Sequence, residues 1–256
     1  MKIKSAREIE CMRKPGLLVW EAHKLTGERI EPGVTTGELD QIVEELFAKH
    51  DAEPLFKGYP GPTPFPAVTC ISVNDAVVHG IPGDYVLQEG DIVSIDTGCR
   101  IDGWCGDAAV THAVGKISNE AQKLLDITSG VLDLSIQLLT ECERWSQVSR
   151  KMQAYVEEAG FSLVESCVCH GIGRDMHEAP QVPNHYSKSF EREEDFQLRK
   201  GLVLAIEPMV NIGTPDVTCL DDQWTQVTLD GSLSAHFEHT VAITADGPIR
   251  LTGPPS

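Results

Sequence analysis

Residues 89–96 (EGDIVSID) and 200–207 (KGLVLAIE) share one pattern: a glycine, a run of apolar residues, and a carboxylate at the end. The preceding helical segments also match, with Leu39, Val43, Leu46 and Phe47 corresponding to Val148, Met152, Tyr155 and Val156. Any two amphipathic helices share this spacing, so the helices alone carry little weight. Because strands and helices agree at nearly the same offset, we expect two similar halves, each a helical layer plus strands, that close around a site between them.

Caps, breakers and apolar periodicity predict the individual elements. Ser5 and Glu8 form a capping box at the start of a first helix, and Pro15 should kink or interrupt that helix because proline lacks an amide donor. Thr36 is the expected N-cap of a helix that ends near Lys49. We predict further helices at 17–30, 118–140 and 145–159, strands at 68–73, 91–96, 108–114, 202–207, 226–229 and 236–244, and loops at 58–66 and 184–200. No stretch resembles an interdomain linker, so residues 1–256 are expected to form a single domain.

The charge balance limits the partners of this chain. Its 21 basic and 39 acidic residues give a formal net charge of -18, which repels phosphate backbones and anionic membrane surfaces. We therefore expect no nucleic-acid specificity and no membrane association. The first residues, MKIKSAREIECMRK, contain no apolar run typical of an export signal, and no segment approaches the roughly 18 apolar residues of a membrane helix. The eight cysteines include no CxxC pair, so we expect reduced thiols in a cytoplasmic protein.

Four carboxylates lie within or beside apolar strand segments, where a buried charge is costly. They are Asp96 in DIVSID, Asp107 in WCGDAAV, Glu207 in LVLAIE and Glu238 in AHFEHT. A buried carboxylate without a cation costs several kcal/mol, or its pKa shifts and the group becomes neutral. Each could pair with Arg or Lys, but these strands contain few basic residues. The four together therefore indicate a site for metal cations.

Three histidines near glycines accompany these carboxylates. His170 in CHGIG is the expected fifth ligand, because adjacent glycines let the backbone approach a ligand closely. His79 in VVHGIP and His177 in MHEAP are further candidates, although a lone histidine of this kind is more often a turn residue. Four carboxylates balance two divalent ions while an imidazole ligand stays neutral, and this oxygen-rich set suits Co, Mn, Fe or Zn without choosing between them. Two such ions lower the pKa of a shared water and stabilise a tetrahedral intermediate.

Competing catalytic motifs are incomplete or absent. His177 and Glu178 begin an HExxH-like segment, but the second histidine is missing and Pro180 would break the helix. The sequence has no GxSxG, GxGxxG or P-loop motif, and its cysteines lack zinc-finger spacing. Metal-dependent hydrolysis is therefore the chemistry that the sequence favours.

The ordered motifs VVHGIP, DIVSIDTG, WCGDAAV, CHGIG, MHEAP, AIEPM and HFEHT resemble those of the type I methionine aminopeptidases of the short bacterial kind. The resemblance runs from the first helix to about residue 250, and the motifs are highly specific in combination. It implies the α+β pita-bread fold, with two pseudo-symmetric halves, strands around a central dinuclear metal site, and helices outside. This fold agrees with the repeat, which rests on separate observations.

The resemblance also implies the metal ligands, residue by residue. The expected ligands of two divalent ions are Asp96, Asp107, His170, Glu207 and Glu238. Asp107 and Glu238 are expected to bridge the ions, and His170 and Glu207 to bind the first of them. Glu207 is also the candidate to take a proton from the attacking water.

The implied substrate is a nascent polypeptide with an N-terminal methionine. His79 and His177 are expected to act catalytically by contacting the scissile amide and the tetrahedral intermediate. The walls of the methionine pocket are expected from Tyr59, Phe65, Cys70, His79, Met176 and Trp224. The implied reaction is removal of the initiator methionine when the second residue is small, by a monomeric, single-domain aminopeptidase whose second metal holds the free amine. The acidity of the chain leaves docking at the ribosome exit region open.

The chain departs from the family pattern at positions that are not expected metal ligands. Cys105 stands where histidine is usual, Ala108 where a hydroxyl residue is common, and Met176 where an aromatic residue is frequent. The loop before Cys70 is longer and carries extra prolines, and Pro15 is unusual within the first helix. These departures bear on pocket shape and rate, and they suggest a divergent or second copy of the enzyme.

Two alternative functions share the implied fold. A prolidase or Xaa-Pro aminopeptidase carries a large extra N-terminal domain, whereas this chain begins its first family-type helix within the first ten residues. A non-catalytic binding module should have lost metal ligands, yet all five are present here together with His79 and His177. The aminopeptidase is therefore the favoured interpretation.

Overall fold

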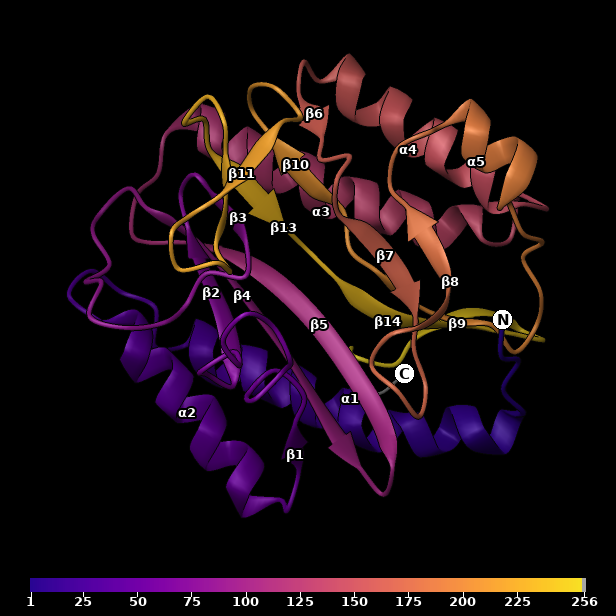
Figure 1. Ribbon diagram of the computed structural model, residues 1–256, viewed down its shortest axis with the longest axis horizontal. Coiled ribbons are helices and arrows are strands. Elements are labelled where there is room, and N and C mark those ends of the chain that lie inside the picture. The colour runs from indigo at the N-terminus through magenta and orange to yellow at the C-terminus, as the bar shows by residue number, and fades with distance from the viewer. Residues whose placement is uncertain (255–256) are drawn as a thin grey trace.

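The computed structural model describes residues 1–254 and shows an α+β fold built from two halves (Figure 1). The first half contains α1 (Ala6–Gly27), α2 (Thr36–Lys49), β1 (Glu53–Pro54), β2 (Thr69–Val73), β3 (Ala76–Val78), β4 (Ile92–Ile101) and β5 (Trp104–Ala113). The second half contains α3 (Asn119–Leu138), α4 (Trp145–Glu158), β6 (Ser162–Leu163), β7 (Val168–Gly171), β8 (Glu178–Pro183), α5 (Lys188–Glu193), β9 (Val203–Ile206), β10 (Met209–Asn211), β11 (Val217–Cys219), β12 (Gln226–Thr228), β13 (Ser234–His236), β14 (His239–Thr244) and β15 (Gly247–Arg250). In this part of the chain, none of the helices has both the length and the apolar character needed to cross a membrane.

The two halves repeat one arrangement of strands. In the first half β4 lies between β2 and β5, and in the second half β9 lies between β7 and β14, with every neighbouring pair antiparallel. Each set follows its own pair of helices, and Figure 1 shows α1 and α2 on one side of the strands and α3 and α4 on the other. The order α2–β2–β4–β5 thus corresponds to α4–β7–β9–β14, which is the pseudo-symmetry that the sequence repeat predicts.

Hydrogen bonds between β5 and the start of β14 join the two halves. The backbone N of Glu238 donates to O of Ala109 at 2.8 Å. The hydroxyl of Thr240 donates to O of Asp107 at 2.8 Å and accepts from N of Asp107 at 3.1 Å. These bonds hold Asp107 of the first half and Glu238 of the second half on adjacent backbone segments.

An apolar core in each half holds the helices on the strands. In the first half Val19 of α1 and Phe47 of α2 pack with the core that includes Cys99 of β4, and all three are fully buried. In the second half Met152 of α4 and Leu204 of β9 belong to one buried cluster. Burying a Val, Leu, Phe or Met side chain contributes about 1.5–3 kcal/mol. The outer helices therefore stabilise the strands that carry the acidic residues.

Helix α1 runs without interruption from Ala6 to Gly27, so the predicted separate helix at 17–30 is wrong and Pro15 does not end the first helix. Pro15 and Gly16 are buried where the helix packs on β5. The two backbones approach closely there, since a Cβ added at Gly106 of β5 would come within 2.7 Å of N of Gly16. A Cβ at Gly16 would in turn meet the backbone of Leu251. Close packing at these glycines offsets the single helical hydrogen bond that proline removes.

Other boundaries also differ from those predicted, and the predicted strand 236–244 is divided into β13 and β14. Thr35 rather than Thr36 caps α2. Strands β4 and β5 pair along their whole lengths, so they extend past 91–96 and begin before 108, and Asp96 and Asp107 lie inside strands rather than at strand ends. The predicted loop 184–200 contains the short helix α5, which buries Phe190. At the strands, pairing with distant residues overrides the local sequence signals, whereas the start of α2 is fixed locally by the capping box of Thr35 and Glu38.

Candidate metal centre

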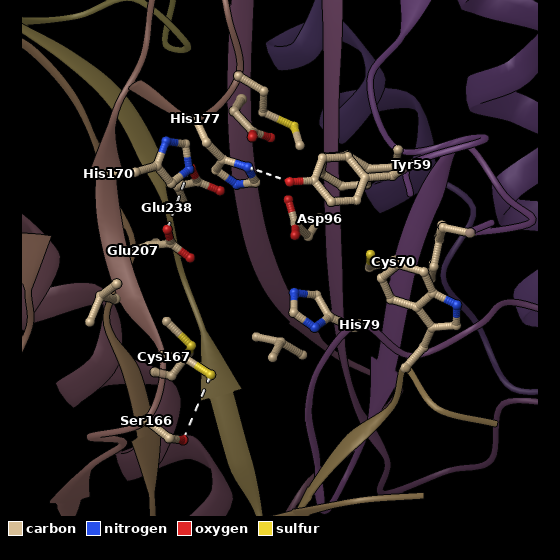
Figure 2. A pocket seen from close by; sticks show the side chains of 18 residues that line it. Tyr59, Cys70, His79, Asp96, Ser166, Cys167, His170, His177, Glu207 and Glu238 are labelled. Carbon is tan, nitrogen blue, oxygen red and sulfur yellow. Dashed lines mark hydrogen bonds and ion pairs between the residues drawn. The ribbon is translucent and has the colours of Figure 1, made fainter. Parts of the chain in front are cut away.

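A cavity of about 370 Å³ opens between the two halves, and strands from both halves carry its acidic lining (Figure 2). Strands β4 and β5 supply Asp96 and Asp107, and β7 supplies His170. Glu207 follows β9 directly, and Glu238 directly precedes β14. The structure therefore brings all five predicted metal ligands to one cavity.

The candidate ligand atoms lie close together. One ligand atom from each of Asp107, His170 and Glu238 lies within 4.8 Å of the other two. Nε2 of His170 is 3.5 Å from Oε1 of Glu207. Asp96 pairs in register with Cys70 and Ala109 on the neighbouring strands, and its carboxylate faces the same cavity (Figure 2). Groups at these separations can share cations.

Burial raises the pKa of all four carboxyl groups. Desolvation raises the pKa of Asp107 to about 7. Desolvation, with repulsion from neighbouring carboxylates, raises the pKa of Asp96, Glu207 and Glu238 well above the ordinary range. The lining includes no Arg or Lys, and one oxygen each of Asp96, Asp107 and Glu238 is buried without a hydrogen-bond partner among residues 1–254. Divalent cations would neutralise these carboxylates and bind the oxygens that have no hydrogen-bond partner, so the residues fit a metal centre.

His170 has the protonation state of a metal ligand. Its Nδ1 donates to the backbone O of Gly171 at 2.9 Å, which leaves the lone pair of the neutral ring on Nε2, the atom nearest Glu207. Burial lowers the pKa of His170 to about 4, so the ring is neutral at pH 7. A second buried histidine, His236, places Nε2 3.7 Å from Oε2 of Glu207, and burial lowers its pKa to about 3.

An apolar region of the same cavity contains the predicted pocket residues. Its lining includes Tyr59, Phe65, Cys70, His79, Met176, His177 and Trp224. The ring of Trp224 packs edge-on against Phe65 with centroids 5.2 Å apart, and its Nε1 donates to O of Thr63 at 3.0 Å. The proline-rich loop 58–66 is therefore part of the pocket wall.

The two predicted catalytic histidines enter the cavity from segments that adjoin different strands. His177, just before β8, lies with its ring centroid 4.3 Å from that of His170 and its Nδ1 2.9 Å from the hydroxyl of Tyr59 (Figure 2). His79, just after β3, has a φ of 59°, a left-handed conformation that non-glycine residues rarely adopt outside special sites. Burial lowers the pKa of both rings, so each is neutral at pH 7 and keeps one N–H donor.

Several cavity residues were not among those predicted. They are Phe56, Val78, Ser166, Cys167, Val168 and Met209. Three of the six lie within two residues of a predicted one, since Val78 precedes His79, Met209 follows Glu207 by two, and Val168 precedes His170 by two. Val168 and His170 are alternate residues of β7, which places their side chains on one face of the strand. Position beside a predicted site residue was the signal that could have identified Val78, Val168 and Met209, whereas Phe56, Ser166 and Cys167 offered no such signal.

Two of the departures from the family pattern lie outside this lining. Cys105 is buried, its Sγ donates to O of Arg174 at 3.4 Å, and burial raises the pKa of the thiol to about 11. Such a thiol is protonated and unreactive at pH 7. Ala108 is buried in the core of the first half. Met176 does line the cavity, so that departure bears directly on pocket shape.

The duplicated fold and the buried acidic centre between its halves define a metal-dependent hydrolase. The sequence model of metallopeptidase family M24 matches residues 10–245, and the chain belongs to this family. The chain is 50% identical over 251 residues to a methionine aminopeptidase of Clostridium perfringens, and the match covers 98% of each chain. Divalent metal ions accompany membership of this family, and the buried cluster of Asp107, His170 and Glu238 fits them.

Solved structures agree with this assignment. The crystal structure of a methionine aminopeptidase from Thermotoga maritima superposes with a TM-score of 0.92 at 42% sequence identity, over 99% of this chain and 100% of that one. A prolidase from Pyrococcus furiosus gives a TM-score of 0.76 at 22% identity, and the match covers 66% of the prolidase. The likeness to the prolidase shows the pita-bread fold alone.

Proposed function

We propose that this protein acts as a methionine aminopeptidase, which hydrolyses the N-terminal methionine from polypeptides in a metal-dependent reaction. One observation carries the proposal: the acidic cluster and an apolar, partly aromatic pocket share a single cavity. An N-terminal amine can therefore approach the acidic groups while an uncharged side chain enters the pocket. The match over 98% of a methionine aminopeptidase, against 66% of a prolidase, supports this activity over Xaa-Pro cleavage.

The metal centre is proposed to hold two divalent ions, drawn from Co, Mn, Fe or Zn. The residues that would hold them are Asp96, Asp107, His170, Glu207 and Glu238. Four carboxylates offset the charge of two such ions while His170 stays neutral. Asp107 and Glu238, which converge with His170, are the proposed bridges. When bound, the ions supply Lewis acidity and lower the pKa of a water molecule.

The chain's own residues are proposed to move the proton and orient the substrate. Glu207 would accept a proton from the attacking water, because its carboxylate lies in the cavity with a raised pKa. His79 and His177, both neutral, would donate N–H groups to the scissile amide and to the negative charge that develops on its oxygen. The hydroxyl of Tyr59 would keep the ring of His177 in the orientation that this requires.

The methionine side chain is proposed to occupy the apolar part of the cavity. Its walls would be Tyr59, Phe65, Cys70, His79, Met176 and Trp224. Aromatic rings suit a thioether, because sulfur–aromatic contacts are favourable. We further propose that cleavage requires a small second residue in the substrate.

The biological setting follows from this activity. Residues 1–256 are proposed to act as a single catalytic domain and as a monomer in the cytoplasm. The partners would be nascent polypeptides, which the protein would encounter at the exit region of the ribosome. The net charge of -18 opposes nonspecific contact with RNA, so any such docking would depend on a local surface.

The first experiment measures release of the first residue from Met-Ala-Ser and from the dipeptide Ala-Pro, together with the metal content of the purified protein. The proposal predicts bound divalent metal and cleavage of Met-Ala-Ser only. Cleavage of Ala-Pro would favour a prolidase-like enzyme, and protein without bound metal and without activity would favour a binding module. A matched control is Asp126→Asn, an exposed acid on α3, which should leave both readouts unchanged.

A further inference from the structure

A buried ion pair holds the first residues of the chain. Nζ of Lys4 donates to Oε2 of Glu178 at 2.8 Å, and the two side chains are only 5% and 1% exposed. The backbone N of Lys4 also donates to O of Gly201 at 2.7 Å, just before β9. The segment that precedes α1 is thereby attached to the second half of the molecule.

Glu178 also holds the turn between β7 and β8. Its Oε1 accepts from the backbone N of Arg174 at 3.0 Å and from Nζ of Lys2 at 3.1 Å. Gly173 leaves the necessary space, because a Cβ there would lie 2.6 Å from Cε of Lys4 and 2.9 Å from Oε1 of Glu178. One carboxylate therefore connects both ends of the 174–178 turn to the N-terminal segment.

The same turn carries His177 into the cavity. His177 directly precedes Glu178, and its ring meets Tyr59 and His170 (Figure 2). The far end of the turn is attached to the first half, where N of Cys105 donates to O of Gly173 at 2.8 Å. Residues 172–177 lie between β7 and β8, outside the pairing of Gly171 with Glu178, so these contacts help to determine where the side chains of the turn lie.

We propose that the Lys4–Glu178 ion pair positions His177, so that Lys4 acts as a positioning residue for the catalytic site. The inference rests on the proposed function, in which His177 acts on the substrate. Loss of Lys4 leaves a buried carboxylate whose remaining cation, Lys2, is 61% exposed. An uncompensated buried charge is strongly unfavourable, so Glu178 turns toward solvent and moves the residue before it. Lys2 at the surface contributes little to this anchoring.

The test compares Lys4→Met with the matched control Lys2→Met in cleavage of Met-Gly-Met-Met. Lys4→Met should lower kcat roughly ten- to hundredfold, because small misplacements of a catalytic group are costly. Metal content should stay at the wild-type level. Lys2→Met should change kcat by less than about twofold, as for most surface substitutions. Wild-type kcat in Lys4→Met, or loss of metal from it, would overturn the positioning role.

A double-mutant cycle with His177→Ala separates positioning from general damage. Where His177 is already absent, Lys4→Met should lower kcat by less than about twofold, because the two changes remove one function. An equally large loss in both backgrounds contradicts the inference. The variant Lys4→Met/Glu178→Leu replaces both charges with apolar groups, so it should keep the wild-type melting temperature and still be slow.

NMR of the His177 ring tests the positioning role without measuring turnover, so its result does not depend on the proposed activity. Imidazole ¹⁵N NMR of His177 should change in Lys4→Met and stay unchanged in Lys2→Met. Unchanged signals in Lys4→Met refute the positioning role. An inactive wild-type enzyme, by contrast, refutes the proposed function, while the NMR comparison still decides whether the ion pair positions His177.

Discussion

Gly98 of β4 lies directly opposite Asp107 of β5, and a Cβ at Gly98 would come within 2.8 Å of Oδ1 of Asp107. The missing side chain therefore leaves the space that the Asp107 carboxylate occupies. Because β4 and β5 pair from Ile92–Ala113 to Ile101–Trp104, neither position can shift without disturbing the ladder. The geometry of the acidic centre thus depends on a residue that has no functional group.

Substitution of this glycine should weaken the centre without removing a ligand. Gly98→Ala pushes against the Asp107 carboxylate, so metal affinity should fall about ten- to hundredfold, as it does when groups that orient metal ligands are changed. Isothermal titration with Mn²⁺ and steady-state kcat provide the two measurements. Gly83→Ala is the matched control, because a Cβ there meets nothing within 4 Å. Wild-type affinity in Gly98→Ala would show that the carboxylate is not confined by this contact.

Removal of a proposed bridging carboxylate should abolish the two-metal centre. Asp107→Ala or Glu238→Ala leaves too few charges to hold both ions, so bound metal and nearly all turnover should be lost. Metal content by mass spectrometry and hydrolysis of a methionyl peptide measure the effect. Near-normal activity in either variant is incompatible with the bridging roles. Asp126→Asn, which removes an exposed acid, serves as the control for net charge.

Relative to a variant that lacks the Asp107 charge, the metal-free protein should lose stability as pH rises from about 4 to about 8. Burial raises the pKa of Asp107 from 3.8 to about 7, so between these values the folded state retains a proton that the unfolded state releases. Stability from this group is present below the lower value and is lost as pH rises through the upper one. Asp107→Asn mimics the protonated acid. In EDTA the variant should therefore have a higher melting temperature than wild type at about pH 8, and the two melting temperatures should converge toward about pH 4.

Melting curves across this pH range, with and without Mn²⁺, provide the measurement. The buried histidines are common to both proteins, so their own titration largely cancels in the comparison. Added metal should raise the melting temperature of wild type and leave Asp107→Asn nearly unchanged. A metal-free wild type that is as stable as the variant at about pH 8 is the result that excludes a destabilising buried charge.

His79 should affect rate and not metal binding. His79→Asn keeps a residue that tolerates the left-handed backbone, with φ of 59° in the structure, while it removes the imidazole. We expect unchanged metal content and a kcat lower by about 10²–10³-fold, the usual cost of losing a group that stabilises the oxyanion. His79→Ala should give the same result with added backbone strain. His50→Asn, at an exposed position, is the control, and loss of metal from the His79 variants would reassign His79 as a ligand.

Local patterns were sufficient to predict the four long helices and the strands β2, β4, β5, β9, β12 and β14, because caps mark helix ends and apolar periodicity reports burial. Other short strands, including β7 and β8 beside the site, were not predicted. The four candidate carboxylate ligands could be predicted because charged residues inside apolar segments require compensation, and those segments contain few bases. The fifth, His170, was indicated by its neighbouring glycines and by the family resemblance. The continuity of α1 through Pro15 could not be predicted, since it depends on contacts with Gly106 and Leu251, far away in the sequence. The full lengths of β4 and β5 depend on their mutual pairing in the same way.

Contacts between distant segments also explain what the site prediction omitted. Lys4 and Glu178 are unremarkable as sequence, and only folding brings them together beside His177. Ser166 and Cys167 have no chemical signal of their own and line the cavity because β7 carries His170 into it. Residues that act by contributing space or position, such as Gly98, are recognisable only once their neighbours are known.

The central claim is tested most directly by steady-state hydrolysis of Met-Gly-Met-Met and Met-Leu-Met-Met, each with Mn²⁺ or Co²⁺ and each against an EDTA control. We predict metal-dependent release of methionine from the first peptide and none from the second, because cleavage requires an N-terminal methionine followed by a small residue. Failure to release methionine from either peptide, by protein that holds its full complement of metal, would contradict the proposed aminopeptidase activity.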